Sequence, residues 1–339
     1  MSFDVPAYTY KCVDRSVLVG PFCRYFVRWF VIWMPPAVPA NMLTIGSSLC
    51  MWGMLLMGLF APLSPVLALW CLALMAGYVI YDHADGMHSR RTGTSSPLGE
   101  YLDHYTDVFH GAIAIAVMFV VAGRVHSPLM VMVLWAVLLA GAATMAEERE
   151  RRELFFGVTG PLEAMLLTLF FFGSWCFDSA AVRWHAPLVG GLTFFETAMA
   201  AGAVGSVMTA VACVRRIGRI PLGLVAYGVM SAILVWSGLY FQAPWWVTAL
   251  LLSLHAGDYT GRVIAGHLRG TPRPWPDVAV PVVMILSGFM GLASVWIVLG
   301  AAAYLLIRNV VSTIGVFSVF GRHWRWLNPP SVSLTAPTE

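Results

Sequence analysis

This sequence has few charged residues. Only 11% of its 339 residues are charged, whereas 59% are hydrophobic and the mean hydropathy is +0.77. A typical soluble domain contains about 25% charged residues. The deficit excludes an ordinary soluble domain and predicts an integral membrane protein. A long linker, a low-complexity tract and a convincing internal repeat are also missing, so we expect one membrane domain.

Lysine is nearly absent as well, since Lys11 is the single lysine among the twenty basic residues. The arginines gather in alternate loops between apolar runs, and only Arg124 and Arg183 lie in the opposite set of loops. By the positive-inside rule, both termini and the loop between residues 82 and 107 are therefore expected in the cytoplasm. The net charge of +3 follows mainly from these arginines, and nothing indicates nucleic-acid binding.

Paired cysteine spacings and a cleavable leader are two further absences. The six cysteines are scattered along the chain, which predicts neither a zinc site nor a disulfide framework. The first 17 residues are polar, so we expect no cleavable signal peptide.

Long apolar runs, in contrast, are abundant. A membrane-spanning helix needs about 20 mostly apolar residues, and about ten runs qualify. The alternation of the arginine-rich loops supports an even number independently. We therefore expect an all-α polytopic membrane protein with about ten transmembrane helices. They are placed near residues 42–62, 64–82, 103–123, 127–146, 159–176, 188–213, 221–240, 244–265, 277–293 and 295–318.

The segment before the first span mixes arginine with aromatic residues. Residues 18–36 contain Arg24 and Arg28 beside several phenylalanines and tryptophans, which is typical of an amphipathic helix in the membrane interface. A simple lead-in to the first span is the alternative. The expected organisation is an N-terminal segment over 1–40 with this interfacial helix, a transmembrane domain over 41–320, and a cytoplasmic tail over 321–339.

Four aspartates stand out at the ends of two apolar runs. Asp82 and Asp85 are three residues apart, and Asp103 and Asp107 are four apart, so each pair lies on one face of a helix. The run "SRRTGTSSPLG" between them predicts the turn of a helical hairpin. The hairpin would bring both pairs together, where their like charges repel unless cations lie between them.

The residue types indicate which cation. Carboxylates without histidine or cysteine ligands favour Mg²⁺, Mn²⁺ or Ca²⁺, and Mg²⁺ is usually shared with phosphates of a substrate. Gly86 and Gly99 leave room for a ligand to approach the helices, and Arg90 and Arg91 can meet phosphate oxygens. The alternative reading as helix caps suits Asp103, but the helix dipole disfavours aspartates at the end of the preceding span.

These positions form a motif. The spacing is Asp82-x-x-Asp85-Gly86-x-x-Ser89-Arg90, eight residues, then Gly99-x-x-x-Asp103-x-x-x-Asp107. It resembles the signature of the CDP-alcohol phosphotransferase family, in which alanine usually occupies the position of Ser89. Further stretches are similar to the choline and ethanolamine phosphotransferase branch, although the resemblance weakens after about residue 170. They are "VPANMLTIG" with Asn41, "SSPLGE", the pair Asp103 and His104, and "LFFGVTGPLEAM" with Glu163.

The resemblance implies a function. Members of this branch are homodimers of ten-helix subunits that transfer phosphocholine or phosphoethanolamine from CDP-choline or CDP-ethanolamine to diacylglycerol and release CMP. It implies two ions, Mg²⁺ with Mn²⁺ as the alternative, bound by the four aspartates. Gly86 and Arg90, with Asn41 and Gly99, would lie on the nucleotide side. The enzyme would be integral to the membrane with its active site facing the cytoplasm, in the endoplasmic reticulum or Golgi of a eukaryote or the inner membrane of a bacterium.

The resemblance also offers two candidates for the base that activates the acceptor hydroxyl. One is His104 assisted by Glu163, and the other is Asp107. A neutral histidine oriented by a carboxylate is a good base near pH 7, whereas a metal-bound carboxylate is held deprotonated by its cation and is a poor one. We favour His104, and the choice between choline and ethanolamine stays open.

One departure from the branch bears on the acceptor. The charged run "MAEERERREL", residues 145–154, stands where the branch is apolar and aromatic, and we expect a solvated helix end or a site for a different acceptor. The alternative function is therefore a phosphatidyltransferase that uses CDP-diacylglycerol and a polar alcohol. A secondary transporter is a third reading, although its carboxylates would be expected near the midplane. In a later span, His255, Asp258 and Arg262 share a face, as functional groups or as an ion pair.

Overall fold

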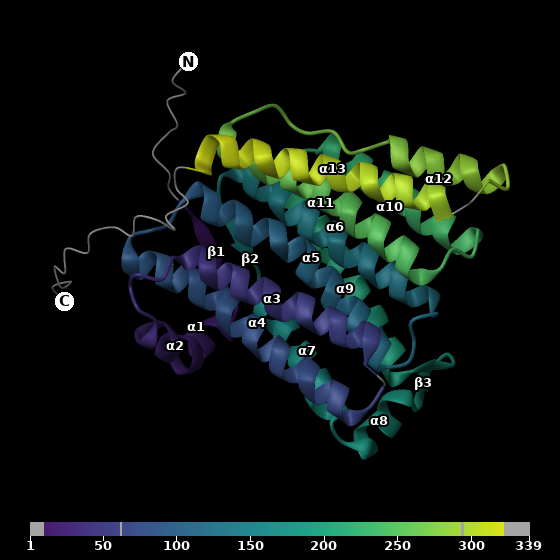
Figure 1. Cartoon of the computed structure of the whole chain (residues 1–339), viewed down its shortest axis with the longest axis horizontal. Coiled ribbons are helices and arrows are strands. Elements are labelled where there is room, and N and C mark those ends of the chain that lie inside the picture. Colours follow the sequence, from purple (N-terminus) through teal and green to yellow (C-terminus); the bar gives the residue numbers. More distant parts are fainter. Residues whose placement is uncertain (1–9, 62, 293–294, 322–339) are drawn as a thin grey trace.

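The computed structural model describes residues 10–61, 63–292 and 295–321, and most of them are helical (Figure 1). The predicted all-α fold is confirmed. The long helices run roughly side by side in an inclined bundle. The predicted tail lies almost wholly outside the described residues. The main helices are α3 (Ala40–Phe60), α4 (Pro65–Thr92), α5 (Pro97–Val121), α6 (Pro128–Arg151), α7 (Pro161–Trp175), α8 (Asp178–His185), α9 (Phe194–Ile217), α10 (Leu222–Tyr240), α11 (Trp245–Arg269), α12 (Ala279–Phe289) and α13 (Val295–Phe320).

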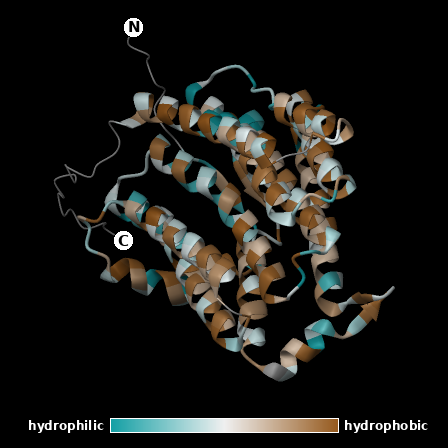
Figure 2. Ribbon diagram, turned by 45° about the vertical axis from the view of Figure 1, so that its right-hand side comes forward, coloured by the Kyte–Doolittle hydropathy of each residue, from teal (hydrophilic) through white to brown (hydrophobic). Residues whose placement is uncertain are grey.

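Most of the long helices are apolar along much of their length, as their brown colouring shows (Figure 2). Within the described ranges, seven helices have the length and composition required to span a bilayer, namely α3, α4, α5, α6, α9, α10 and α13, and the bent pair α7 and α8 would make eight. The expected count of ten is not confirmed, although a helix lies at each of the ten predicted positions. Helix α12 has 11 residues, and α11 carries Asp258 and Arg262 in its middle.

The N-terminal segment is helical from Val19 to Trp33. Helices α1 (Val19–Phe22) and α2 (Arg28–Trp33) flank the π-helical turn η1 (Cys23–Val27). Trp29 and Trp33 are exposed, as an interfacial helix requires, but its place in the membrane remains a prediction. Arg91 fastens this segment to the end of α4 by donating 2.5 Å hydrogen bonds to the carbonyls of Val31 and Met34.

The hairpin between α4 and α5 is tighter than predicted. Helix α4 continues to Thr92 and ends at Gly93, whose φ of +64° suits glycine. Helix α5 begins at Pro97 because the Ser96 side chain accepts the Gly99 N–H at 3.1 Å, and proline is favoured at the first helical position. Both helices therefore extend into the predicted turn of residues 89–99 and well beyond the apolar runs. The aspartates lie inside the helices, as their helical spacing predicted, but Asp103 does not cap α5.

The charged run at the end of α6 is packed between helices, so the prediction of a solvated end was wrong for part of it. Glu147 is 1% exposed and accepts two hydrogen bonds from Arg216 of α9, at 2.6 and 2.8 Å. Glu150 accepts from Arg219 and from Arg273, the latter at 2.6 Å. Hydrogen bonding to Glu150 raises the pKa of the Arg273 guanidinium. These pairs join α6 to α9 and to the loop after α11.

Two short sheets complete the fold. Strand β1 (Cys12–Asp14) pairs in parallel with β2 (Leu154–Phe156), which binds the N-terminal segment to the chain after α6. Strands β3 (Pro187–Val189) and β4 (Leu192–Thr193) pair antiparallel after α8, at the other end of the bundle (Figure 1). All six cysteines are free thiols.

A buried ion network joins α11 to α13. Asp258 is 1% exposed and lies 2.5 Å from Nη2 of Arg262 and 3.1 Å from Nε of Arg308. Tyr304 donates a 3.0 Å hydrogen bond to Asp277, which lies just before α12. The ion pair expected between Asp258 and Arg262 is therefore present, and it extends to Arg308.

We expect Asp258→Asn to lower the free energy of unfolding by about 3 kcal/mol, since removing one partner of a buried pair strands the opposite charge. Thermal unfolding in detergent measures this change. The matched control is Glu153→Gln, since Glu153 is 34% exposed and lies 3.7 Å from Arg151; its loss should cost less than about 1 kcal/mol. Equal unfolding temperatures for the two variants would contradict the network's role.

Candidate metal and nucleotide site

Three of the four aspartates converge where α4 faces α5, with both helices packed against α3. Asp82 comes from α4, and Asp103 and Asp107 come from α5; one carboxylate oxygen of each lies within 4.8 Å of the others. Like charges held this close repel strongly, and more so where protein excludes water. An all-oxygen donor set fits Mg²⁺ or Mn²⁺. The three residues can therefore hold a divalent cation.

Asp85 lies apart from this cluster but next to it. Its side chain is buried, and its carboxylate accepts a 2.6 Å hydrogen bond from the Thr44 hydroxyl of α3. It interacts electrostatically with Asp82 and Asp103. The expected set of four is thus three grouped carboxylates and a fourth that α3 orients.

Asp107 is held by two residues that the sequence analysis missed. Tyr78 donates to Asp107 Oδ1 at 3.3 Å, and His110 Nδ1 lies 3.3 Å from the same oxygen. The other ring nitrogen of His110 lies 3.0 Å from the Ser48 hydroxyl of α3. Such partners fix the direction of a metal-binding carboxylate. The signal for His110 was present, since it follows Asp107 by three residues on the same helix face.

The two glycines of the motif lie under polar side chains. A Cβ at Gly86 would lie 3.3 Å from Arg90 Nη1, and a Cβ at Gly99 would lie 3.1 Å from Asn41 Oδ1. Both contacts are tighter than ordinary van der Waals distance, so glycine lets Arg90 and Asn41 lie against the helices. Arg91, in contrast, is bound to the carbonyls at the end of α2, so the expectation that it meets phosphate finds no support.

His104 lies beside the cluster, one residue after Asp103. Its Nδ1 is 3.7 Å from Asp103 Oδ2, and its side chain is 9% exposed. Within the described part of the chain, its buried Nε2 has no hydrogen-bond partner. The Tyr10 ring lies nearby, with its centroid 6.2 Å from that of the imidazole. An imidazole nitrogen in this state can accept a proton from a substrate.

Glu163 lies in the first turn of α7. Its carboxylate accepts the Gly160 N–H at 2.7 Å, as in a capping box, and it also accepts the Ser16 hydroxyl. These bonds tie the N-terminal segment to α7. The pairing of Glu163 with His104 stays a prediction. A different carboxylate, that of Glu148, interacts electrostatically with His104.

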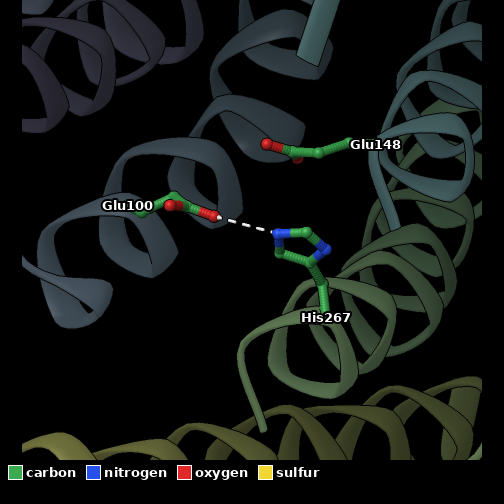
Figure 3. Close-up of side chains that lie close together, drawn as sticks. All are labelled: Glu100, Glu148 and His267. Carbon is green, nitrogen blue, oxygen red and sulfur yellow. Dashed lines mark ion pairs between the residues drawn. The ribbon is translucent and has the colours of Figure 1, made fainter. Parts of the chain in front are cut away.

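A second acidic group lies close by (Figure 3). Glu100 of α5, Glu148 of α6 and His267 of α11 point toward one another, and one ligating atom of each lies within 4.8 Å of the others. His267 Nε2 is 3.8 Å from Glu100 Oε1. Sequence reasoning did not find this group, since Glu148 was taken as part of a charged run and His267 was not considered.

The Thr44 hydroxyl provides a test of the site. We expect Thr44→Val, which keeps the shape of the side chain, to leave Asp85 without its hydrogen bond and to weaken Mn²⁺ binding about 10- to 100-fold. Isothermal titration with MnCl₂ measures the affinity. Ser47→Ala is the control, because Ser47 bonds only the Thr44 carbonyl among its described contacts. Unchanged Mn²⁺ affinity in Thr44→Val would show that the hydrogen bond to Asp85 does not contribute to metal binding.

Comparison with known proteins identifies the family. The sequence profile described as CDP-alcohol phosphatidyltransferase matches residues 37–215, which is more than half of the chain and includes every aspartate of the site. Cholinephosphotransferase 1 of Saccharomyces cerevisiae is 27% identical over 196 residues, 55% of this chain and 49% of the relative, so the match spans about half the length of that relative. Choline/ethanolaminephosphotransferase 1 of the same yeast is 24% identical over 326 residues, covering 84% and 81%.

Human Ethanolaminephosphotransferase 1 is 30% identical over 147 residues, 39% of this chain and 36% of the relative. The profile match and the structure agree, since the matched range includes the three aspartates that α4 and α5 bring together. The chain is an integral membrane protein that belongs to the CDP-alcohol phosphatidyltransferase family.

Proposed function

We propose that this protein transfers phosphocholine or phosphoethanolamine from CDP-choline or CDP-ethanolamine to diacylglycerol and releases CMP. The products would be phosphatidylcholine or phosphatidylethanolamine. The observation that carries the proposal is the convergence of Asp82, Asp103 and Asp107 within 4.8 Å. The names of the relatives describe the same chemistry.

The aspartates would bind the cations that this chemistry uses. Asp82, Asp103 and Asp107, with Asp85 beside them, would hold two Mg²⁺ ions or, alternatively, Mn²⁺. When bound, such ions neutralise the charge that gathers on the diphosphate and on the departing CMP. Arg90 would contact the phosphate oxygens with its planar guanidinium. Asn41, Gly86 and Gly99 would line the nucleotide side.

The acceptor hydroxyl of diacylglycerol would give its proton to Nε2 of His104. The hydroxyl oxygen then attacks the phosphorus that carries the choline or ethanolamine, and the bond from that phosphorus to the CMP oxygen breaks. Burial keeps competing water away from the imidazole. Glu163 remains the proposed acidic partner of His104, and Asp107 remains the alternative base.

The site would face the cytoplasm. The alternation of arginine-rich loops supports this orientation, and α1 and α2 lie at the same end of the bundle as the hairpin between α4 and α5 (Figure 1). An interfacial position of α1 and α2 would then place the aspartates at the membrane surface. A homodimer, and residence in the endoplasmic reticulum or Golgi of a eukaryote or the inner membrane of a bacterium, follow from the resemblance to the branch.

The arginines near the end of α6 argue against the alternative with CDP-diacylglycerol and a phosphorylated acceptor. Arg149 donates to the carbonyls of Val263 and Thr271, and Arg152 donates to that of His267 at 2.8 Å. These arginines therefore hold the end of α11. Their bonds to backbone carbonyls give them a role in packing, which weakens the case for a second phosphate at these arginines.

Turnover of a CDP-alcohol tests the proposed function directly. The purified protein is supplied with diacylglycerol, Mg²⁺ and CDP-choline or CDP-ethanolamine, and CMP and lipid product are measured. Asp85→Asn should abolish turnover, because a buried ligand of the metal site is lost. Glu153→Gln is the control, since Glu153 is 34% exposed and pairs with Arg151, so its loss should not affect the rate. Failure of the folded protein to release CMP from any CDP-alcohol would refute the proposal.

The base is tested by three variants. His104→Ala should lower kcat about 10²- to 10⁴-fold, the usual contribution of a general base, while CDP binding persists. Asp107→Asn should instead weaken Mn²⁺ binding as well. His126→Ala is the control, because His126 is an exposed residue of the loop after α5. Full activity of His104→Ala would transfer the role of base to Asp107.

A further inference from the structure

Glu148 is the exception among the acids of the charged run. Glu147 pairs with Arg216, Glu150 with Arg273, and Glu153 with Arg151. Glu148 is only 4% exposed, yet within the described part of the chain no hydrogen bond or ion pair reaches its carboxylate. It points instead toward Glu100 and His267 (Figure 3).

The surroundings of Glu148 are acidic and largely buried. Glu100 is 8% exposed and has His267 beside it, so the two carboxylates of Glu100 and Glu148 lie close together away from water. A further positive charge between these carboxylates would be favourable. The three side chains come from three helices. Arg152 donates to the His267 carbonyl and so holds the backbone of the last turn of α11. One potential ligand atom of each residue lies within 4.8 Å of the others.

This acidic group adjoins the proposed catalytic site. Glu100 precedes Asp103 by three residues on α5, so their Cβ atoms are about 5–6 Å apart on one helix face. His104 interacts electrostatically with both Glu148 and His267. In CDP-ethanolamine and CDP-choline, two carbons separate the phosphate ester oxygen from the cationic nitrogen. A phosphate placed at the aspartates would thus put this nitrogen near the turn of α5 that carries Glu100.

The donor atoms distinguish between the two cations. A primary ammonium has three N–H donors, which match two carboxylates and one neutral imidazole. A quaternary ammonium has no N–H group and is typically recognised by a cage of aromatic rings, whereas this group consists of two carboxylates and an imidazole.

We propose that Glu100, Glu148 and His267 bind the protonated primary amine of the donor alcohol, so that the protein prefers CDP-ethanolamine to CDP-choline. This inference rests on the proposed function and names its substrate.

The test compares kcat/KM for CDP-ethanolamine and CDP-choline at fixed diacylglycerol and Mg²⁺. The unmodified protein should prefer CDP-ethanolamine at least tenfold. Glu148→Gln should reduce that preference about tenfold or more, mainly through KM, because a charged hydrogen bond is lost. Glu153→Gln, the same change in the same run, should retain the preference. The comparison of donors on the unmodified protein needs no variant, so the test holds even if Glu148→Gln does not fold.

Three outcomes would overturn the inference. Equal kcat/KM for the two donors would refute it while leaving the proposed function intact. An equal loss with both donors in Glu148→Gln, with a higher Mg²⁺ requirement, would show that the group holds a divalent ion. Failure of the unmodified protein to release CMP from either donor would refute the inference together with the proposed function.

Discussion

The repulsion among the carboxylates of Asp82, Asp103 and Asp107, which face one another between α4 and α5, is the constraint on which the rest of the structure depends. Asp82, Asp103 and Asp107 lie within 4.8 Å of one another, where their like charges oppose the packing that brings them together. The neighbouring helix α3 supplies hydroxyl groups that bind Asp85 and His110, and the short hairpin fixes the register of the pair. The arrangement becomes favourable once cations are shared with a diphosphate, which links the stability of this region to substrate binding.

The convergence of the aspartates could be predicted from the sequence more closely than the ends of the helices that carry them. Spacings of three and four residues are enough to place aspartates on one helix face, so their convergence followed from the hairpin. The helix ends did not follow, because hydropathy marks the apolar part of a helix and misses its polar continuation. Helix α4 therefore extends to Thr92. The bond from Thr44 to Asp85 joins residues 41 positions apart and has no local signal.

The charged run at the end of α6 is a second case in which the sequence could not predict the contacts. Its composition suggested a solvated surface, but its acids pair with arginines that lie 69 and 123 residues further along the chain. Only the packed structure reveals that Glu148 is left out of this pairing and directed inward. Glu163 was predicted only from the resemblance of its segment to the branch, and its contact with Ser16 of the N-terminal segment has no local signal in the sequence.

The central claim is that the grouped aspartates bind divalent cations together with the CDP part of the donor. An experimental structure of the protein with Mn²⁺ and CDP, with manganese located by its anomalous scattering, tests it most directly. The account predicts manganese within about 2–2.5 Å of carboxylate oxygens of Asp82, Asp103 and Asp107, with the diphosphate on the same ions. Manganese bound elsewhere, or CDP bound away from these aspartates, would contradict it.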